Sequence, residues 1–147
     1  MSEEVGKIIR DTESAMQKAL NHLETELVIT YFASQINSHK NINDLLYDIS
    51  KNCVGRLHFE DCVIYLVDEQ KKVLVQKAAC GFRNPADFTI FKSIGIPMGQ
   101  GIVGTVAQTG KPELVLNTQN DPRYVVDDER KFSEIAVPVI IDKKVIG

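Results

Sequence analysis

Hydrophobic residues near the N-terminus recur at steps of three and four positions, which is the spacing of one face of a helix. The members of this seam are Ile9, Thr12, Met16, Ala19 or Leu20, Leu23 and Leu27. No proline interrupts residues 5–36, so the pattern predicts one long helix. A seam this narrow cannot bury such a helix against one small domain, and we expect its N-terminal half to pair with another chain. The alternative is a leader whose last turns alone cap the domain.

A second helix is predicted after the turn at residues 38–40. Asn41 is the expected N-cap, and Asp44 follows three residues later, as in a capping box. Apolar residues then repeat at helical spacing and form a broad face, which places the helix in the core. These residues are Ile42, Leu45, Leu46, Ile49, Cys53 and Leu57.

The period then changes to that of strands. Residues 61–68 are apolar at every interior position, residues 69–72 form a charged turn, and residues 73–80 return as the second strand of a hairpin. Further strands are expected at 112–116 and 133–139, and residues 140–147 read as a strand, a charged turn and the start of a last strand. The fold class is therefore α+β with an antiparallel sheet.

A glycine-rich run at residues 99–104 fits the G-x-G-x-x-G pattern of dinucleotide-binding proteins. The segment before it is short and broken by Gly95 and Pro97, and the next strand ends on Asn117 instead of an acidic residue. These departures argue against a nucleotide. The requirements of folding explain the glycines. Gly99 and Gly101 allow positive backbone dihedrals, Gly104 allows close packing, and Gly110 ends the helix.

Composition bounds the class of protein. The 147 residues suffice for one domain with an appended helix, and 44% hydrophobic with 25% charged residues is typical of soluble globular proteins. A net charge of −3 means that the chain lacks the excess of basic residues that is typical of nucleic-acid-binding proteins. No apolar run approaches the roughly 20 residues that span a bilayer, and the N-terminus is too polar for a signal peptide. We therefore expect a cytoplasmic location.

Three cysteines, Cys53, Cys62 and Cys80, are an odd number without a C-x-x-C spacing, so neither a disulfide framework nor a zinc site is predicted. We expect Cys53 and Cys62 to pack in the core. The three histidines, His22, His39 and His58, stand apart from one another, and no metal site is predicted.

Four segments together resemble the GAF family of regulatory and ligand-sensing domains. The glycine-rich run 96–112 carries its main signature, and residues 121–124, 133–139 and 145–147 agree in order and spacing. The resemblance covers about residues 31–147 and leaves residues 1–30 as the N-terminal helix. It implies a PAS-like fold, with N-terminal helices on one face of the sheet and pocket-forming loops on the other. Members normally complete the last strand and add a helix, so a continuation is expected.

The resemblance also implies a ligand pocket and a sensory or regulatory function. Its expected lining residues are Phe82, Phe88, Phe91, Gly101, Ile102, Val103, Asp121, Arg123 and Tyr124. The expected protein binds an unidentified small molecule and signals through a homodimeric helix to an effector such as the histidine kinase of a two-component system. If the phenylalanines fill the pocket instead, the protein is a ligand-free dimerisation or interaction module.

Specialised members of the family fit less well. Cyclic-nucleotide binders carry a lysine where Asp121 stands, and free methionine-(R)-sulfoxide reductases carry a cysteine at the position of Val103. Valine cannot attack a sulfoxide. The sequence lacks the cysteine that covalent bilin attachment requires, and it lacks an evident axial ligand for haem. No catalytic residue is therefore assigned, and the sequence favours a protein that is not an enzyme.

Overall fold

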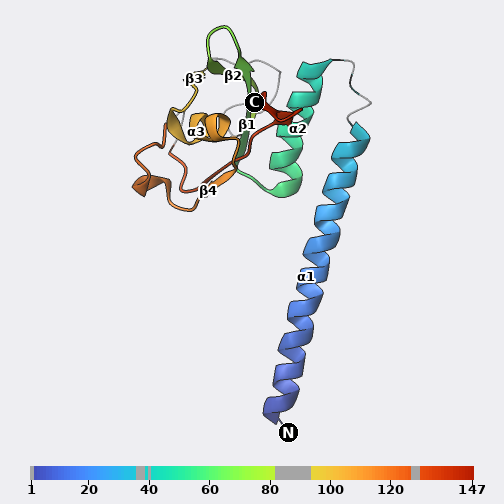
Figure 1. Ribbon diagram of the computed structural model, residues 1–147. Coiled ribbons are helices and arrows are strands. Elements are labelled where there is room, and N and C mark those ends of the chain that lie inside the picture. The colour runs from blue at the N-terminus through green and yellow to red at the C-terminus, as the bar shows by residue number, and fades with distance from the viewer. Residues whose placement is uncertain (1, 36–38, 40, 82–93, 127–129) are drawn as a thin grey trace. The chain divides into compact units, whose positions relative to one another are not determined.

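A computed structural model describes residues 2–35, 39, 41–81, 94–126 and 130–147 of the chain. The residues form two compact units, Met1–Leu45 and Leu46–Gly147. In chain order the elements are α1 (Ser2–Gln35), α2 (Ile42–Leu57), β1 (Asp61–Asp68), β2 (Val73–Gly81), β3 (Gly95–Pro97), α3 (Gly101–Thr109), β4 (Glu113–Val115), the short 3-10 helix η1 (Thr118–Asn120), β5 (Glu134–Ala136), β6 (Ile140–Ile141) and β7 (Lys144–Val145) (Figure 1).

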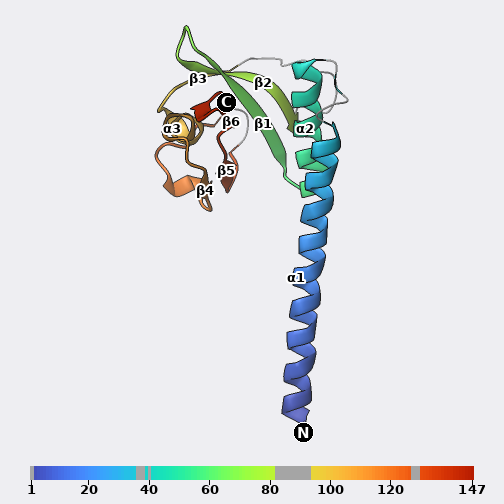
Figure 2. The ribbon, with the colours of Figure 1, turned by 45° about the vertical axis from the view of Figure 1, so that its right-hand side comes forward.

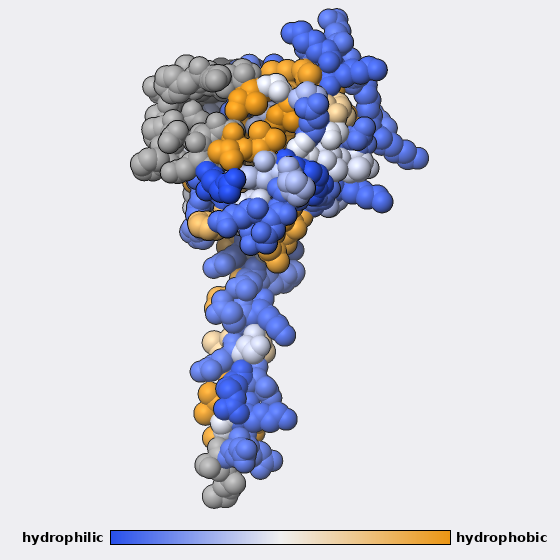
Figure 3. Space-filling view, turned by 90° about the vertical axis from the view of Figure 1, so that its left-hand side faces the viewer, coloured by the Kyte–Doolittle hydropathy of each residue, from blue (hydrophilic) through white to orange (hydrophobic). Residues whose placement is uncertain are grey.

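The first unit is dominated by α1, a single uninterrupted helix of 34 residues. The predicted long helix is thereby confirmed. Its seam residues Leu20, Leu23 and Leu27 remain 51%, 58% and 69% exposed. Figure 3 shows apolar side chains along one edge of this helix on a mostly hydrophilic surface. None of the described helices combines the length and apolarity needed to cross a membrane.

The start of α2 is capped as the sequence predicts. The Asn41 side-chain oxygen accepts the backbone N–H of Asp44 at 2.9 Å, and the Asn41 amide donates to the Asp44 carboxylate at 2.6 Å. The second contact differs from a standard capping box, in which the acidic side chain returns to the N-cap backbone. Leu46 and Ser50 are buried in the middle of the helix, whereas Ile42 and Leu57 at its ends are exposed.

The predicted hairpin of β1 and β2 is confirmed, and β3 pairs antiparallel with the free edge of β2 (Figure 2). The Asp68 carboxylate accepts the N–H groups of Gln70 and Lys71, which fixes the turn between the strands. Ile64 faces Ala78 and Tyr65 faces Gln76, so Lys77 is one extra residue in β2. This bulge shifts the pairing of everything beyond it by one position.

The core lies between α3 and the strands. Tyr65, Leu74 and Ala107 form one buried cluster, with Val63 and Val67 of β1 packed against it. A second cluster joins α3 to β5 and is extended by β4 and by Tyr124. Its buried members are Ile102, Val106 and Ala136. Leu74 is 0% and Ile102 is 2% exposed, so α3 is anchored on one face of the strands.

Two smaller antiparallel pairs, β4 with β5 and β6 with β7, complete the described strands. The end of the chain connects the pair of β6 and β7 to the first sheet, because Val67 in β1 donates its N–H to the carbonyl of Ile146 at 2.9 Å. Ile146 and Val139 are in turn hydrogen-bonded. Asp142 and Lys143 have positive φ angles of 49° and 64°, as a two-residue type I′ hairpin turn requires. Helices with antiparallel strands confirm the α+β class.

Candidate functional site

The glycine-rich run builds a tight turn that starts α3. Gly99 and Gly101 have φ angles of 81° and 69°, and Gly99 donates its N–H to the carbonyl of Gly104 at 2.8 Å. A Cβ on Gly104 would lie 2.6 Å from the carbonyl oxygen of Pro97, so the helix contacts the preceding strand backbone directly. The strands on either side pair antiparallel, whereas a dinucleotide-binding unit has parallel strands. The glycines thus have the structural roles predicted for them.

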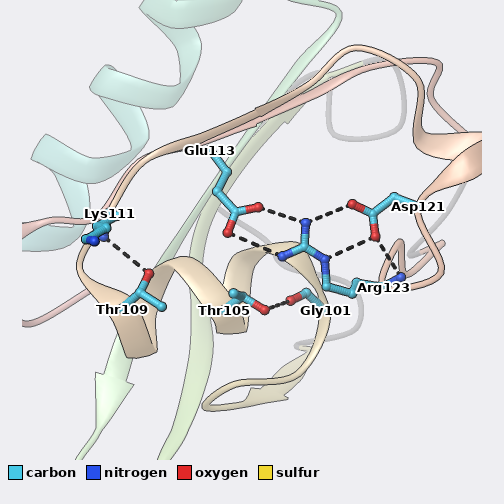
Figure 4. Close-up of polar contacts among 7 residues, drawn as sticks. All are labelled: Gly101, Thr105, Thr109, Lys111, Glu113, Asp121 and Arg123. Carbon is cyan, nitrogen blue, oxygen red and sulfur yellow. Dashed lines mark hydrogen bonds and ion pairs between the residues drawn. The ribbon is translucent and has the colours of Figure 1, made fainter.

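An ion-pair cluster lies beside the first turns of α3 (Figure 4). The Arg123 guanidinium donates to both oxygens of Glu113, at 3.3 and 2.8 Å. It also donates to both oxygens of Asp121, at 3.1 and 2.8 Å, and the backbone N–H of Arg123 adds a third bond to Asp121 at 2.9 Å. These contacts tie the loop at 121–123 to β4.

The two carboxylates neutralise the positive charge of Arg123. Its hydrogen bonds hold the pKa of Asp121 below its ordinary value, and Asp121 and then Glu113 raise the pKa of Arg123. One cation between two anions leaves the cluster with a net negative charge. Arg123 is therefore poorly placed to recruit an anionic ligand, because a phosphate or carboxylate would have to displace one of its partners.

The loop after η1 is also held from inside. Tyr124 packs against the cluster of Ile102, Val106 and Ala136, and its hydroxyl accepts the backbone N–H of Lys131 at 2.8 Å. Thr118 is 1% exposed. Its hydroxyl donates to the carbonyl of Lys131. The side chains of Tyr124 and Thr118 thus hold the backbone of Lys131 through two hydrogen bonds.

Six of the predicted lining residues gather around the N-terminal half of α3. Ile102 is a core residue, Val103 is half-buried and packs against both core clusters, and the backbone of Arg123 covers Gly101. Asp121 and Tyr124 lie in the same loop as Arg123. The other three, Phe82, Phe88 and Phe91, lie outside the described residues. Contact of this set with a ligand stays a prediction.

Sequence reasoning missed Glu113, Thr118 and Lys131. Glu113 is ten residues from Arg123, and no local pattern indicates that β4 brings the two together. Thr118 and Lys131 meet only because the loop closes on itself. Within the described residues, no group of three or more His, Cys, Asp or Glu is arranged to hold a metal ion.

Comparison with known proteins decides the family. A family model described as "GAF domain" matches residues 39–147, which is most of the chain. The chain belongs to the GAF domain family. This match begins a few residues after the end of α1, so the family model does not include the long helix.

Solved structures support the GAF fold. The GAF domain from a phosphoenolpyruvate-protein phosphotransferase of Coxiella burnetii matches with a TM-score of 0.75 and 15% identity, over 86% of this chain and 75% of that one. A free methionine-R-sulfoxide reductase from Neisseria meningitidis matches with a TM-score of 0.69 and 22% identity, over 81% and 66% of the two chains. At these identities the likeness concerns the fold alone.

A sequence relative covers less of this GAF domain. Protein YtsP of Bacillus subtilis (strain 168) is 33% identical over 54 residues, which are 37% of this chain and 33% of YtsP. The match thus spans about a third of that relative's length.

Proposed function

We propose that this GAF domain is a sensory or regulatory module that binds a small molecule and transmits the signal through a helical homodimer to an effector such as a histidine kinase. The observation that carries the proposal is the uncovered apolar seam of α1. Met16, Leu20, Leu23 and Leu27 are each at least half exposed in the single chain, and they recur with the spacing of a coiled-coil contact.

The energetics favour pairing of this seam. Burying one such side chain contributes roughly 1.5 to 3 kcal/mol. Four side chains from each of two copies can together exceed the association cost of about 4 to 15 kcal/mol. A helix pair with two arrangements is also a suitable output device, because a ligand that binds one arrangement better shifts the equilibrium between them.

The proposed ligand site adjoins the N-terminal half of α3 and the loop at 121–126. Val103 and Gly101 supply apolar and backbone surface there, and the loop is held in place by the Arg123 ion pairs and by Tyr124. Such preorganisation lowers the entropy cost of binding. Because Arg123 is already neutralised, the site favours a neutral or cationic molecule over an anion.

A second candidate function is a ligand-free dimerisation module. It is favoured by apolar side chains on the face of β4 and β5 that points away from α3. Leu114 and Ile135 are paired directly across these strands and are 63% and 55% exposed, and Val137 continues the same face. In this case the dimer contact extends onto the sheet of a second copy and no small molecule is needed.

Native mass spectrometry of protein purified from cells separates the two candidates. The sensor proposal predicts one additional small molecule per domain in the native spectrum, absent from the denatured spectrum of the same sample. Native and denatured masses that agree after purification from several growth conditions would contradict the sensor proposal and favour the ligand-free module.

We also propose that the domain is not an enzyme. The closest enzymatic alternative is reduction of free methionine sulfoxide, the activity named for the Neisseria relative. That chemistry needs a thiolate to attack the sulfoxide and a second thiol to resolve the product, and Val103 has no thiol. A cytoplasmic location stays a prediction of the sequence.

A further inference from the structure

Lys131 connects two parts of the second unit that lie far apart in the sequence. Its ammonium group lies 3.5 Å from a carboxylate oxygen of Glu60 and 3.8 Å from a carboxylate oxygen of Asp61. Glu60 and Asp61 stand at the junction of two elements, since α2 ends at Leu57 and β1 begins at Asp61. The side chain of Lys131 therefore joins the loop after η1 to the junction between α2 and β1.

The backbone of Lys131 is fixed to the loop that borders the proposed ligand site. The Tyr124 hydroxyl accepts its N–H at 2.8 Å, and the Thr118 hydroxyl donates to its carbonyl. Thr118 also donates its own N–H to the carbonyl of the next residue, Phe132, at 2.9 Å. Because Tyr124 packs against the core cluster that contains Ile102 of α3, a displacement of Tyr124 also displaces Lys131.

The other end of the connection is closely packed. Asp61 is directly opposite Gly81 in the hairpin, and a Cβ on Gly81 would lie 2.7 Å from the Cβ of Asp61. The chain between α2 and β1 is short, residues 58–60, and it begins with His58 in a left-handed conformation at a φ of 57°. A movement of Asp61 is therefore passed to the end of α2, because no slack segment lies between them.

The ion pairs of Lys131 differ from other lysine pairs of this unit in their burial. The Lys131 side chain is 22% exposed, whereas those of Lys71 and Lys144, which also pair with carboxylates, are 76% and 63% exposed. A largely buried ammonium group has given up much of its hydration, so it depends on its carboxylate partners more than a surface lysine does.

We propose that Lys131 is a positioning residue that couples the loop at 121–126 to the end of α2, so that a molecule bound beside α3 changes the position of α2. The use of this coupling for signalling rests on the proposed sensory function, because α2 links the second unit to α1 along the chain. The two arrangements are the loop with the Lys131 ion pairs formed and the loop with them broken, and a ligand that favours one arrangement shifts the population toward it.

Hydrogen–deuterium exchange of the full chain, without any ligand, tests the coupling through a double-mutant cycle. Tyr124→Phe removes the acceptor of the Lys131 N–H. It should speed exchange at residues 57–62, relative to residues 73–76 of β2, by roughly two- to tenfold, the range for the loss of one hydrogen bond. In the Lys131→Met background the same substitution should have no effect on that ratio, because the ion pairs that transmit it are gone.

Two further variants complete the cycle. Lys144→Met is the matched control, since Lys144 forms an exposed ion pair with Glu69 at the hairpin turns, and Tyr124→Phe should keep its full effect in this background. Thr118→Val removes the donor to the Lys131 carbonyl. It probes the loop independently and should depend on Lys131 in the same way as Tyr124→Phe.

The ratio of exchange rates separates coupling from a general loss of stability, which speeds exchange in both segments alike. The proposal is overturned if neither Tyr124→Phe nor Thr118→Val changes the ratio, or if their effects are equal in the wild-type and Lys131→Met backgrounds. The cycle needs neither a ligand nor a dimer. The sensor proposal is tested by native mass spectrometry, so the failure of one is distinguishable from the failure of the other.

Discussion

At the scale of single residues, a close approach of backbone to backbone in the second unit depends on a missing side chain. Gly104 lies in the first half of α3 against Pro97, where a Cβ would meet a backbone carbonyl oxygen at 2.6 Å. A flexible side chain could yield to such a contact, but a backbone can do so only if the turn at 97–101 moves. Because the interior is closely packed, the absence of a side chain at Gly104 fixes the position of α3 and hence of the residues around the proposed site.

Gly104→Ala should therefore destabilise the protein, by roughly 1 to 3 kcal/mol, as is typical of overpacking in a rigid environment. Gly55 is the matched control, since a Cβ there meets nothing within 4 Å in the helix α2. Gly55→Ala should stabilise the protein by about 0.5–1 kcal/mol through the greater helix propensity of alanine. Urea unfolding of the three proteins measures both changes. Equal stability of the two variants would show that Gly104 has no packing role.

At the scale of elements, local patterns predicted the helices and the hairpins, because each is encoded within a short stretch of chain. The cap at Asn41, the turn at Asp68 and the glycines of the α3 turn are examples. The pairing of Cys62 with Cys80 was not predictable, since it depends on a bulge at Lys77 that no local residue pattern marks. The contact of Glu113 with Arg123 likewise depends on how β4 is placed.

The N-cap offers a test at this scale. Asn41→Ala removes the acceptor of the Asp44 N–H and should cost about 0.5–2 kcal/mol of unfolding free energy. Asn43→Ala changes the same residue type two positions later, at an exposed site within the first turn of α2, and should leave stability nearly unchanged. Thermal unfolding followed by circular dichroism compares the two. If both variants unfolded at the same temperature as the wild type, a capping role of Asn41 would be excluded.

At the scale of the whole molecule, the GAF fold accommodates both sensors and enzymes, so the fold does not decide the function. The position of the thiols is more informative. Cys62 and Cys80 lie on the face of the strands opposite α3, whereas Val103 lies on α3 itself. Cys62 and Cys80 are thus separated by the strands from the place where the proposed ligand would bind.

Purified protein should accordingly show no thioredoxin-dependent turnover of free methionine sulfoxide. The free methionine-R-sulfoxide reductase of Neisseria meningitidis is the positive control in the same assay. Turnover by this chain that is abolished by Cys80→Ser would demonstrate a catalytic thiol and overturn the proposal that the domain is not an enzyme.

Pairing through α1 is the central claim, and sedimentation of the full chain at tens of micromolar tests it most directly. The wild type should sediment as a dimer. Leu20→Glu places a charge in the seam and should weaken association about a hundredfold or more. Thr25→Glu adds the same charge on the opposite side of the helix, at an exposed position, and should remain dimeric. A monomeric wild type, or a Leu20→Glu variant as dimeric as Thr25→Glu, would contradict the account.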